Sequence, residues 1–148
     1  MGMAITLQEY LSDIGVAYEV LTHPHRISSS RVAQSAAISG ECLAKGVLLQ
    51  DDAGYLLAVL PSTRRVDLEK IQTLLGRPVD MASEEDLEDL FPDCDPGAVP
   101  PVGAAYGMPV VIDDSLVGRK DIYFEAGDHR CLVHVAGPEF GRVMRGAE

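Results

Sequence analysis

The chain has 148 residues, of which 12 are basic and 23 acidic, so its net charge is −11. That length suits one domain over residues 1–148, with a core large enough to fold without a metal or a disulfide. The negative charge argues against proteins that bind DNA through a broad basic surface, and the sequence has neither a secretory signal pattern nor an apolar run of the ~20 residues that span a membrane, so we expect a cytoplasmic protein.

The first part of the chain predicts two helices separated by a strand. Thr6 and Glu9 form a capping box, and the helix that follows them ends at Gly15. Residues 16–21 are predicted as a short strand. A serine cluster then predicts the start of an alanine-rich helix over residues 28–37.

A hairpin is predicted next, and it carries the first candidate for a functional site. Residues 44–50 and 55–60 are apolar strands joined by a short turn that ends in Gly54. Lys45 is a lone cation at the head of the first strand. Desolvating an unpaired ammonium is expensive, so this lysine must either reach water or hold an anion or a polarised carbonyl. A lysine exposed at a strand end remains the alternative.

Two helices and a long loop follow the hairpin. Asp67 is predicted to cap a helix that ends at Gly76, and Ser83 to cap an acidic helix over residues 84–91. Prolines and glycines interrupt residues 92–109, which we expect to form an ordered loop without regular structure.

The last part of the chain predicts three strands and a final helix. The strands cover residues 110–113, 122–126 and 131–135, with a turn at Gly127 between the last two, and the helix covers residues 138–144. The fold class is therefore mixed α/β, with antiparallel hairpins outnumbering crossovers.

Several common chemistries lack their motifs in this chain. We find no G-x-S-x-G elbow, Walker loop, G-x-G-x-x-G fingerprint or H-E-x-x-H pair. Cys42, Cys94 and Cys131 are odd in number and have no C-x-x-C spacing, which predicts reduced thiols without a disulfide framework. The histidines do not supply a zinc spacing either, so we expect no metal and no cofactor.

The segment from Gly97 to Gly103 is the second candidate. Glycines at both ends allow a ligand to approach the backbone, and the prolines stiffen the path so that N–H and C=O groups stay preorganised. Such a loop can polarise a carbonyl group. A rigid connector between a helix and a strand is the alternative.

One ordered set of motifs runs through nearly the whole chain: His23-Pro24, Ser28 with Ala33, Lys45 to Leu48, Gly97 to Pro101 with Gly103, Pro109 to Asp113, and Ala126-Gly127. In this order and spacing the chain resembles the YbaK/ProX family of aminoacyl-tRNA deacylases, which includes the editing domain inserted in bacterial prolyl-tRNA synthetases. Many members of that family have threonine after the lysine, where this chain has Gly46.

The resemblance implies a mixed α/β domain with a largely antiparallel, barrel-like sheet and surrounding helices. It also implies hydrolysis of tRNA mischarged with a small amino acid such as alanine, cysteine or serine. Lys45 matches the family's required lysine, and the mechanism expected has no covalent nucleophile. The matching substrate-binding positions are Ser28, Gly97, Ala98, Pro101, Gly103 and Gly127.

The partners expected from the resemblance are the 3′ end of an aminoacyl-tRNA and an aminoacyl-tRNA synthetase. A synthetase would supply the basic surface that this acidic chain lacks. A non-catalytic module that binds a small molecule or a protein on the same fold is the alternative function, because a fold does not fix a function.

Overall fold

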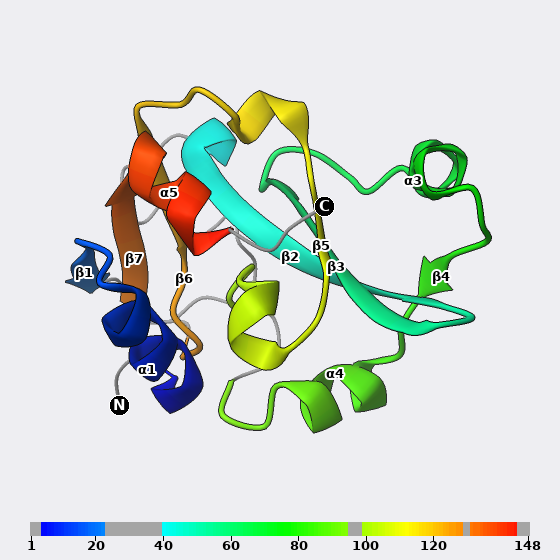
Figure 1. Ribbon diagram of the computed structural model, residues 1–148, viewed down its shortest axis with the longest axis horizontal. Helices are drawn as coiled ribbons and strands as arrows, with labels where there is room; N and C mark the ends of the chain where they lie inside the picture. The colour runs from blue at the N-terminus through cyan, green and yellow to red at the C-terminus, as the bar shows by residue number, and fades with distance from the viewer. Residues whose placement is uncertain (1–3, 23–39, 95–98, 129–130, 145–148) are drawn as a thin grey trace.

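The computed structural model describes residues 4–22, 40–94, 99–128 and 131–144 (Figure 1). The helices are α1 (Ile5–Ile14), α3 (Leu68–Leu75), α4 (Glu84–Leu90) and α5 (Gly137–Val143), with three short 3-10 helices, η1 (Gly40–Cys42), η2 (Gly103–Tyr106) and η3 (Asp114–Leu116). The strands are β1 (Glu19–Thr22), β2 (Leu43–Asp51), β3 (Gly54–Pro61), β4 (Asp80–Met81), β5 (Val110–Ile112), β6 (Asp121–Glu125) and β7 (Cys131–Ala136). The helix expected over residues 28–37 lies outside the described residues. Within them, no helix is long and apolar enough to cross a membrane.

The strands form one mixed sheet in the order β1-β7-β6-β2-β3-β5, with β4 paired to β2 off this path. The β1–β7, β6–β7, β2–β3 and β2–β4 pairs are antiparallel, whereas β2–β6 and β3–β5 are parallel. The mixed α/β class is thus confirmed. Over the residues described, β1 and β5 lie at opposite ends of the sheet and are not paired with each other, so closure into a barrel is not observed.

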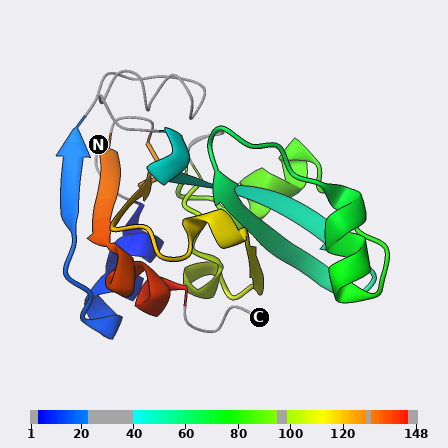
Figure 2. The same cartoon turned by 90° about the horizontal axis from the view of Figure 1, so that it is seen from above.

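Different helices pack on the two faces of the sheet. Successive side chains of a strand point to opposite faces, so each face has its own core. One face carries the larger core, in which α1 and α5 pack through Leu7, Leu11, Phe140 and Val143. The other face, at the end formed by β2 and β3, is covered by α3 through Ile71. Figure 2 shows α1 and α5 together at one end of the molecule and α3 at the other.

Several helix ends are those predicted from the sequence. Gly15 and Gly76 take left-handed conformations, with φ of 68° and 70°, and end α1 and α3. The Asp67 carboxylate accepts from the N–H of Lys70 at 3.1 Å and caps α3, and Ser83 caps α4 in the same way. Local capping chemistry is therefore enough to fix these boundaries.

The capping box predicted at Thr6 is wrong. The N-cap is Ala4, two residues before Thr6, so helix α1 begins at Ile5, and Ala4 makes no side-chain cap. The N–H of Thr6 instead donates to Asp93 Oδ2 at 2.9 Å, so a residue 87 positions away satisfies this first-turn donor.

The long loop predicted over residues 92–109 is also partly wrong, because η2 forms inside it. The Tyr106 hydroxyl at the end of η2 donates to Asp93 Oδ1 at 3.0 Å, and the Tyr106 ring lies 4.5 Å from that of Phe91. Asp93 therefore joins α1 to η2.

We expect Asp93→Ala to destabilise the protein by about 1–3 kcal/mol at neutral pH, because it removes the acceptor of three partly buried hydrogen bonds. Burial raises the pKa of Asp93, but hydrogen bonds from Thr6, Tyr106 and Cys94 outweigh burial and hold that pKa below its usual value. A carboxyl with a lowered pKa stabilises the fold above its unfolded pKa and loses that effect as pH falls through its folded pKa. The difference from wild type should therefore shrink in acid.

Urea unfolding between pH 3 and 7 measures this difference. Asp52→Ala, at an exposed position in the β2–β3 turn, is the matched control and should leave stability nearly unchanged. An Asp93→Ala protein as stable as wild type at pH 7 would contradict the role of Asp93.

Candidate active site at the fork between β2 and β6

Strand β2 parts from β6 after two paired residues. Leu43 and Ala44 pair with β6, and the next pairing on that side joins Leu49 and Gln50 to β4. The intervening residues 45–48 have no strand partner on this side in the part of the chain that the structure describes. We call this opening the fork.

The backbone of Gly46 faces the fork. The Ala82 N–H donates to Leu48 O at 3.1 Å on this side, whereas Ser62 N–H donates to Leu43 O on the β3 side. Backbone groups of alternate residues in a strand face the same edge, so the N–H and C=O of Gly46 face the same way as those of Leu48. An N–H at this position suits a carbonyl or oxyanion.

Lys45 lies at the start of the fork and is partly buried. It has no hydrogen-bond or ion-pair partner among the described residues. Burial lowers the pKa of Lys45, and the nearby charge of Arg65 lowers it further. An ammonium that is partly desolvated without a partner is one that can gain by meeting an anion.

Pro101 packs against β2 beside Lys45, but on the other face. A Cβ added to Gly46 would lie 3.1 Å from Pro101 Cα and 3.2 Å from the side chain of Leu57. Because side chains alternate along a strand, the Lys45 side chain leaves β2 on the face opposite this contact. Lysine and loop therefore flank the same stretch of β2 from two sides.

Gly103 and Gly127, the two described glycines among the predicted substrate-binding positions, are held by packing. A Cβ at Gly103 would lie 2.5 Å from Val110 Cγ2 and 2.7 Å from Met108 O. Gly127 has φ of 114°, and a Cβ there would lie 2.9 Å from that of Ala4. Both positions need glycine for the fold itself. Ser28, Gly97 and Ala98 lie outside the described residues, so their predicted roles are not tested.

Two acidic residues that the sequence analysis missed lie near the fork. Glu125 at the end of β6 is 2% exposed, and Asp128 in the following turn is 4% exposed. Burial, together with the charge of Asp128, raises the pKa of Glu125 to about 8. The signal was present in the sequence: Glu125 interrupts an apolar strand, as Lys45 does.

A second polar cluster, farther along the same sheet, ties three strands together. His134 on β7 lies 2.6 Å from Glu19 of β1 and 2.8 Å from Asp121 of β6, and it stacks on the Tyr123 ring at 4.6 Å. Burial lowers the pKa of His134, but the hydrogen bonds to the two carboxylates outweigh burial and raise it. No cluster among the described residues could hold a metal ion.

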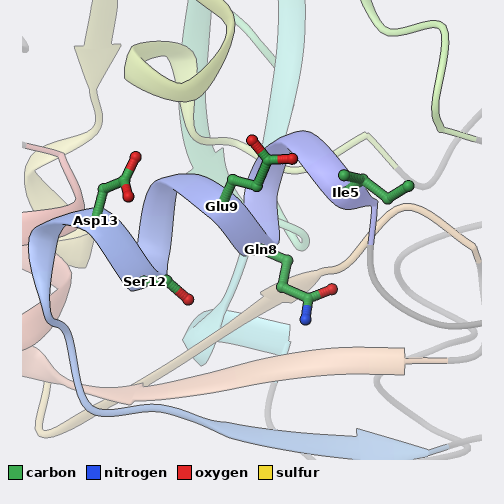
Figure 3. A pocket seen from close by; sticks show the side chains of 5 residues that line it. All are labelled: Ile5, Gln8, Glu9, Ser12 and Asp13. Atoms are coloured by element: carbon green, nitrogen blue, oxygen red, sulfur yellow. The ribbon is translucent and has the colours of Figure 1, made fainter.

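A shallow hollow on α1 lies away from these groups. Figure 3 shows its lining side chains, all of them from α1: Ile5, Gln8, Glu9, Ser12 and Asp13. All five are exposed, and none is a residue of the fork. The hollow therefore offers no desolvated group for chemistry.

A model of the aminoacyl-tRNA editing domain matches residues 23–143 of this chain. The chain belongs to this family. The resemblance described from the motifs is thereby confirmed. No curated protein matches the chain.

Solved structures give the same fold. A candidate trans-editing enzyme for prolyl-tRNA synthetase is 26% identical, with a TM-score of 0.83, and the match covers 98% of this chain and 92% of that one. A hypothetical protein that is 22% identical has a TM-score of 0.84, with 96% and 95% of the two chains covered. A candidate signal transduction protein from Marinobacter aquaeolei is 21% identical with a TM-score of 0.77, and the match covers 97% of this chain but 29% of that one.

We expect Gly46→Ala to destabilise the editing domain by about 1–2 kcal/mol, because the new methyl group would press on the Pro101 backbone and on the buried Leu57 side chain. Thermal unfolding measures the change. Gly141→Ala is the matched control: nothing lies within 4 Å of its added Cβ, and alanine favours its helix, so its stability should be unchanged or higher. Equal stability of the two variants would show that the loop does not press on Gly46.

The raised pKa of Glu125 predicts a pH dependence of stability. A carboxyl whose folded pKa lies above its unfolded value binds more protons when folded, so stability falls as pH rises from about 4.5 to 8. Glu125→Gln should remove this fall, which is on the order of a few kcal/mol. Urea unfolding of both proteins between pH 5 and 8.5 measures the difference, with the exposed Glu69→Gln as control. Parallel pH profiles of wild type and Glu125→Gln would rule out a protonated Glu125.

Proposed function

We propose that this editing domain is an aminoacyl-tRNA deacylase that hydrolyses the ester of tRNA mischarged with a small amino acid. The observation that carries the proposal is Lys45: a partly buried ammonium without a described partner, at the fork of the sheet, in a chain of the editing-domain family.

The proposed reaction needs position and charge rather than a nucleophilic side chain. A water oxygen, or a hydroxyl or thiol of the substrate, attacks the ester carbonyl carbon, and negative charge develops on the carbonyl oxygen. The Lys45 ammonium and the Gly46 N–H are suited to stabilise that charge. The acyl–oxygen bond then breaks, and the ribose oxygen leaves with the proton that the attacking water, hydroxyl or thiol has lost. With water as the nucleophile, the products are the free amino acid and the tRNA.

The loop is proposed to complete the site from the other face of β2. Pro101 packs on Gly46, and Val99 and Val102 are buried in the larger core, so this segment is held rigidly. A rigid pocket wall excludes amino acids with large side chains by steric clash, but it discriminates poorly between side chains that differ by one methylene. Alanine, cysteine and serine are therefore the proposed cargo, with Ser28, Gly97, Ala98, Pro101, Gly103 and Gly127 as proposed substrate-binding positions.

The net charge of −11 bears on how such a domain reaches RNA. An acidic surface repels the phosphates of tRNA. A second protein with a basic surface therefore has to supply the affinity for the body of the tRNA. We propose that a prolyl-tRNA synthetase, the enzyme named in the description of one structural neighbour, holds the tRNA while this domain takes its 3′ end.

A binding module without turnover is the second candidate function. Its support is that the same fold forms 29% of a longer candidate signal transduction protein. Incubating the domain with tRNAs charged with alanine, cysteine, serine or proline separates the two candidates, because only the enzyme releases amino acid.

We expect Lys45→Ala to lower kcat/KM for deacylation of alanyl-tRNA(Pro) by about 100-fold or more, since it removes the charge that stabilises the oxyanion. Release of radiolabelled alanine measures the rate. Lys70→Ala, on the exposed side of α3, is the control and should keep wild-type activity. Circular dichroism of each variant checks the fold, and undiminished hydrolysis by folded Lys45→Ala would refute the role of Lys45.

A further inference from the structure

Lys45 lies on the face of the sheet that α3 covers. Val47 and Leu49, the next alternate residues of β2, belong to the core cluster that includes Ile71 of α3. Alternate side chains of a strand share a face, so the Lys45 side chain leaves β2 on this face as well. Its partner in register is Leu60, near the end of β3. The segment that leaves β3 for α3 therefore begins beside Lys45.

Backbone and side-chain contacts hold the start of this segment in place. The Ser62 N–H donates to Leu43 O at 2.8 Å, and the Ser62 hydroxyl donates to Gly40 O at 2.9 Å. The Arg64 N–H then donates to Pro61 O at 3.0 Å, which closes a turn. The end of β3 and the turn after it are therefore fixed relative to β2.

This turn brings Arg65 to the face that carries Lys45. Val66 and Leu68, which follow Arg65, pack against the same core cluster as Val47. The charge of Arg65 acts on Lys45 and, after burial, is the second cause that lowers the Lys45 pKa. Arg65 is exposed, whereas Lys45 is partly buried. Two positive charges thus lie close together, one in solvent and one partly desolvated.

The charge of the neighbouring Arg64 acts on a carboxylate instead. Burial raises the pKa of Asp113, but hydrogen bonds from Ser115 and the charges of nearby cations, Arg64 among them, outweigh burial and lower it. Among the described residues, no acidic group acts on Lys45 in this way. Two cations that repel each other gain from an anion brought to them, so the pair formed by Arg65 and Lys45 suits an anionic ligand.

An aminoacyl-tRNA carries an anion and its ester on the same sugar. The ribose of the terminal nucleotide bears the ester on its 2′ or 3′ oxygen and a phosphodiester on its 5′ oxygen. A cation that binds this phosphate must therefore lie near the group that faces the ester carbonyl, and Arg65 stands in that relation to Lys45. A guanidinium also suits this partner, because its planar set of donors can hold two phosphate oxygens at once.

Building on the proposed deacylase activity, we infer that Arg65 binds the 5′-phosphate of the terminal nucleotide while Lys45 faces the ester carbonyl. The substrate is then recognised as an aminoacyl nucleotide rather than as an ester alone. An aminoacyl nucleoside, which has the same sugar and ester but no phosphate, is a poor substrate. The contact is local, so it operates in spite of the net charge of −11.

The experiment compares two small esters, alanyl-adenosine and the same ester with a methyl phosphate on its 5′ oxygen. Neither has another phosphate, so contacts with the rest of a tRNA cannot contribute. Each rate is divided by the spontaneous hydrolysis rate of the same ester. Wild type should prefer the phosphate-bearing ester by about 10-fold or more in kcat/KM, the value of one charge-assisted contact.

The adjacent arginines supply matched variants. Arg65→Ala should lose most of the preference, and Arg65→Lys, which keeps the charge but not the planar donors, should retain part of it. Arg64→Ala and the exposed Lys120→Ala should keep the wild-type preference. Removing Arg65 also relieves the repulsion on Lys45, but that change affects both esters alike and cancels in the ratio. Partial unfolding of a variant cancels too, because the ratio is taken within one protein preparation.

A binding measurement separates this inference from the proposed activity. The probes are the non-hydrolysable 3′-alanylamido-adenosine with and without the 5′ methyl phosphate, titrated into each protein by calorimetry. Tighter binding of the phosphate-bearing probe by wild type, lost in Arg65→Ala, supports the inference even if wild type hydrolyses neither ester, a result that would overturn the deacylase proposal alone.

Three outcomes overturn the inference and leave the deacylase proposal standing. The first is a wild type that treats the two esters and the two probes alike. The second is a preference that persists in Arg65→Ala. The third is an equal loss of the preference in Arg65→Ala and Lys120→Ala, because general surface charge would then account for it.

Discussion

The early separation of β2 from β6 is the constraint on which the site depends. Two residue pairs join these parallel strands at Leu43 and Ala44. Beyond them, β2 continues along β3, and among the described residues its other edge has no strand partner until β4. A fully paired central strand would satisfy its own backbone and bury its side chains. The separation instead leaves the Gly46 peptide group and the residue Lys45 at one opening.

Packing around glycines makes this opening rigid. Pro101 packs closely against Gly46 on one face of β2. Val110 and Met108 pack against Gly103 in the same way, and Ala4, just before α1, packs against Gly127. Each contact joins segments distant in sequence, and none leaves room for a Cβ without movement. The proposed substrate-binding positions Pro101, Gly103 and Gly127 are thus also packed within the fold, so the contacts that fold the domain also set the geometry of the proposed site.

Charge is distributed in a way that fits a domain acting on the end of an RNA. The chain as a whole is acidic, whereas Lys45 presents a partly desolvated positive charge near that of Arg65. At physiological ionic strength the Debye length is about 8 Å, so local charges in a partly buried site outweigh distant ones on the surface. Under the proposed function, recognition of the aminoacyl end depends on this site, and attachment to the rest of the tRNA depends on a partner.

The sequence by itself determined the mixed α/β class, the β2–β3 hairpin, the caps at Asp67 and Ser83, and the family, because each depends on local chemistry or on motif order. It also singled out Lys45 as a cation in an apolar strand. Only the tertiary structure decided that Asp93 accepts a hydrogen bond from the first turn of α1, that η2 forms within the long loop, and that Glu125 is buried near Asp128. These features depend on contacts between residues far apart in the chain and on strand register, which no local pattern encodes.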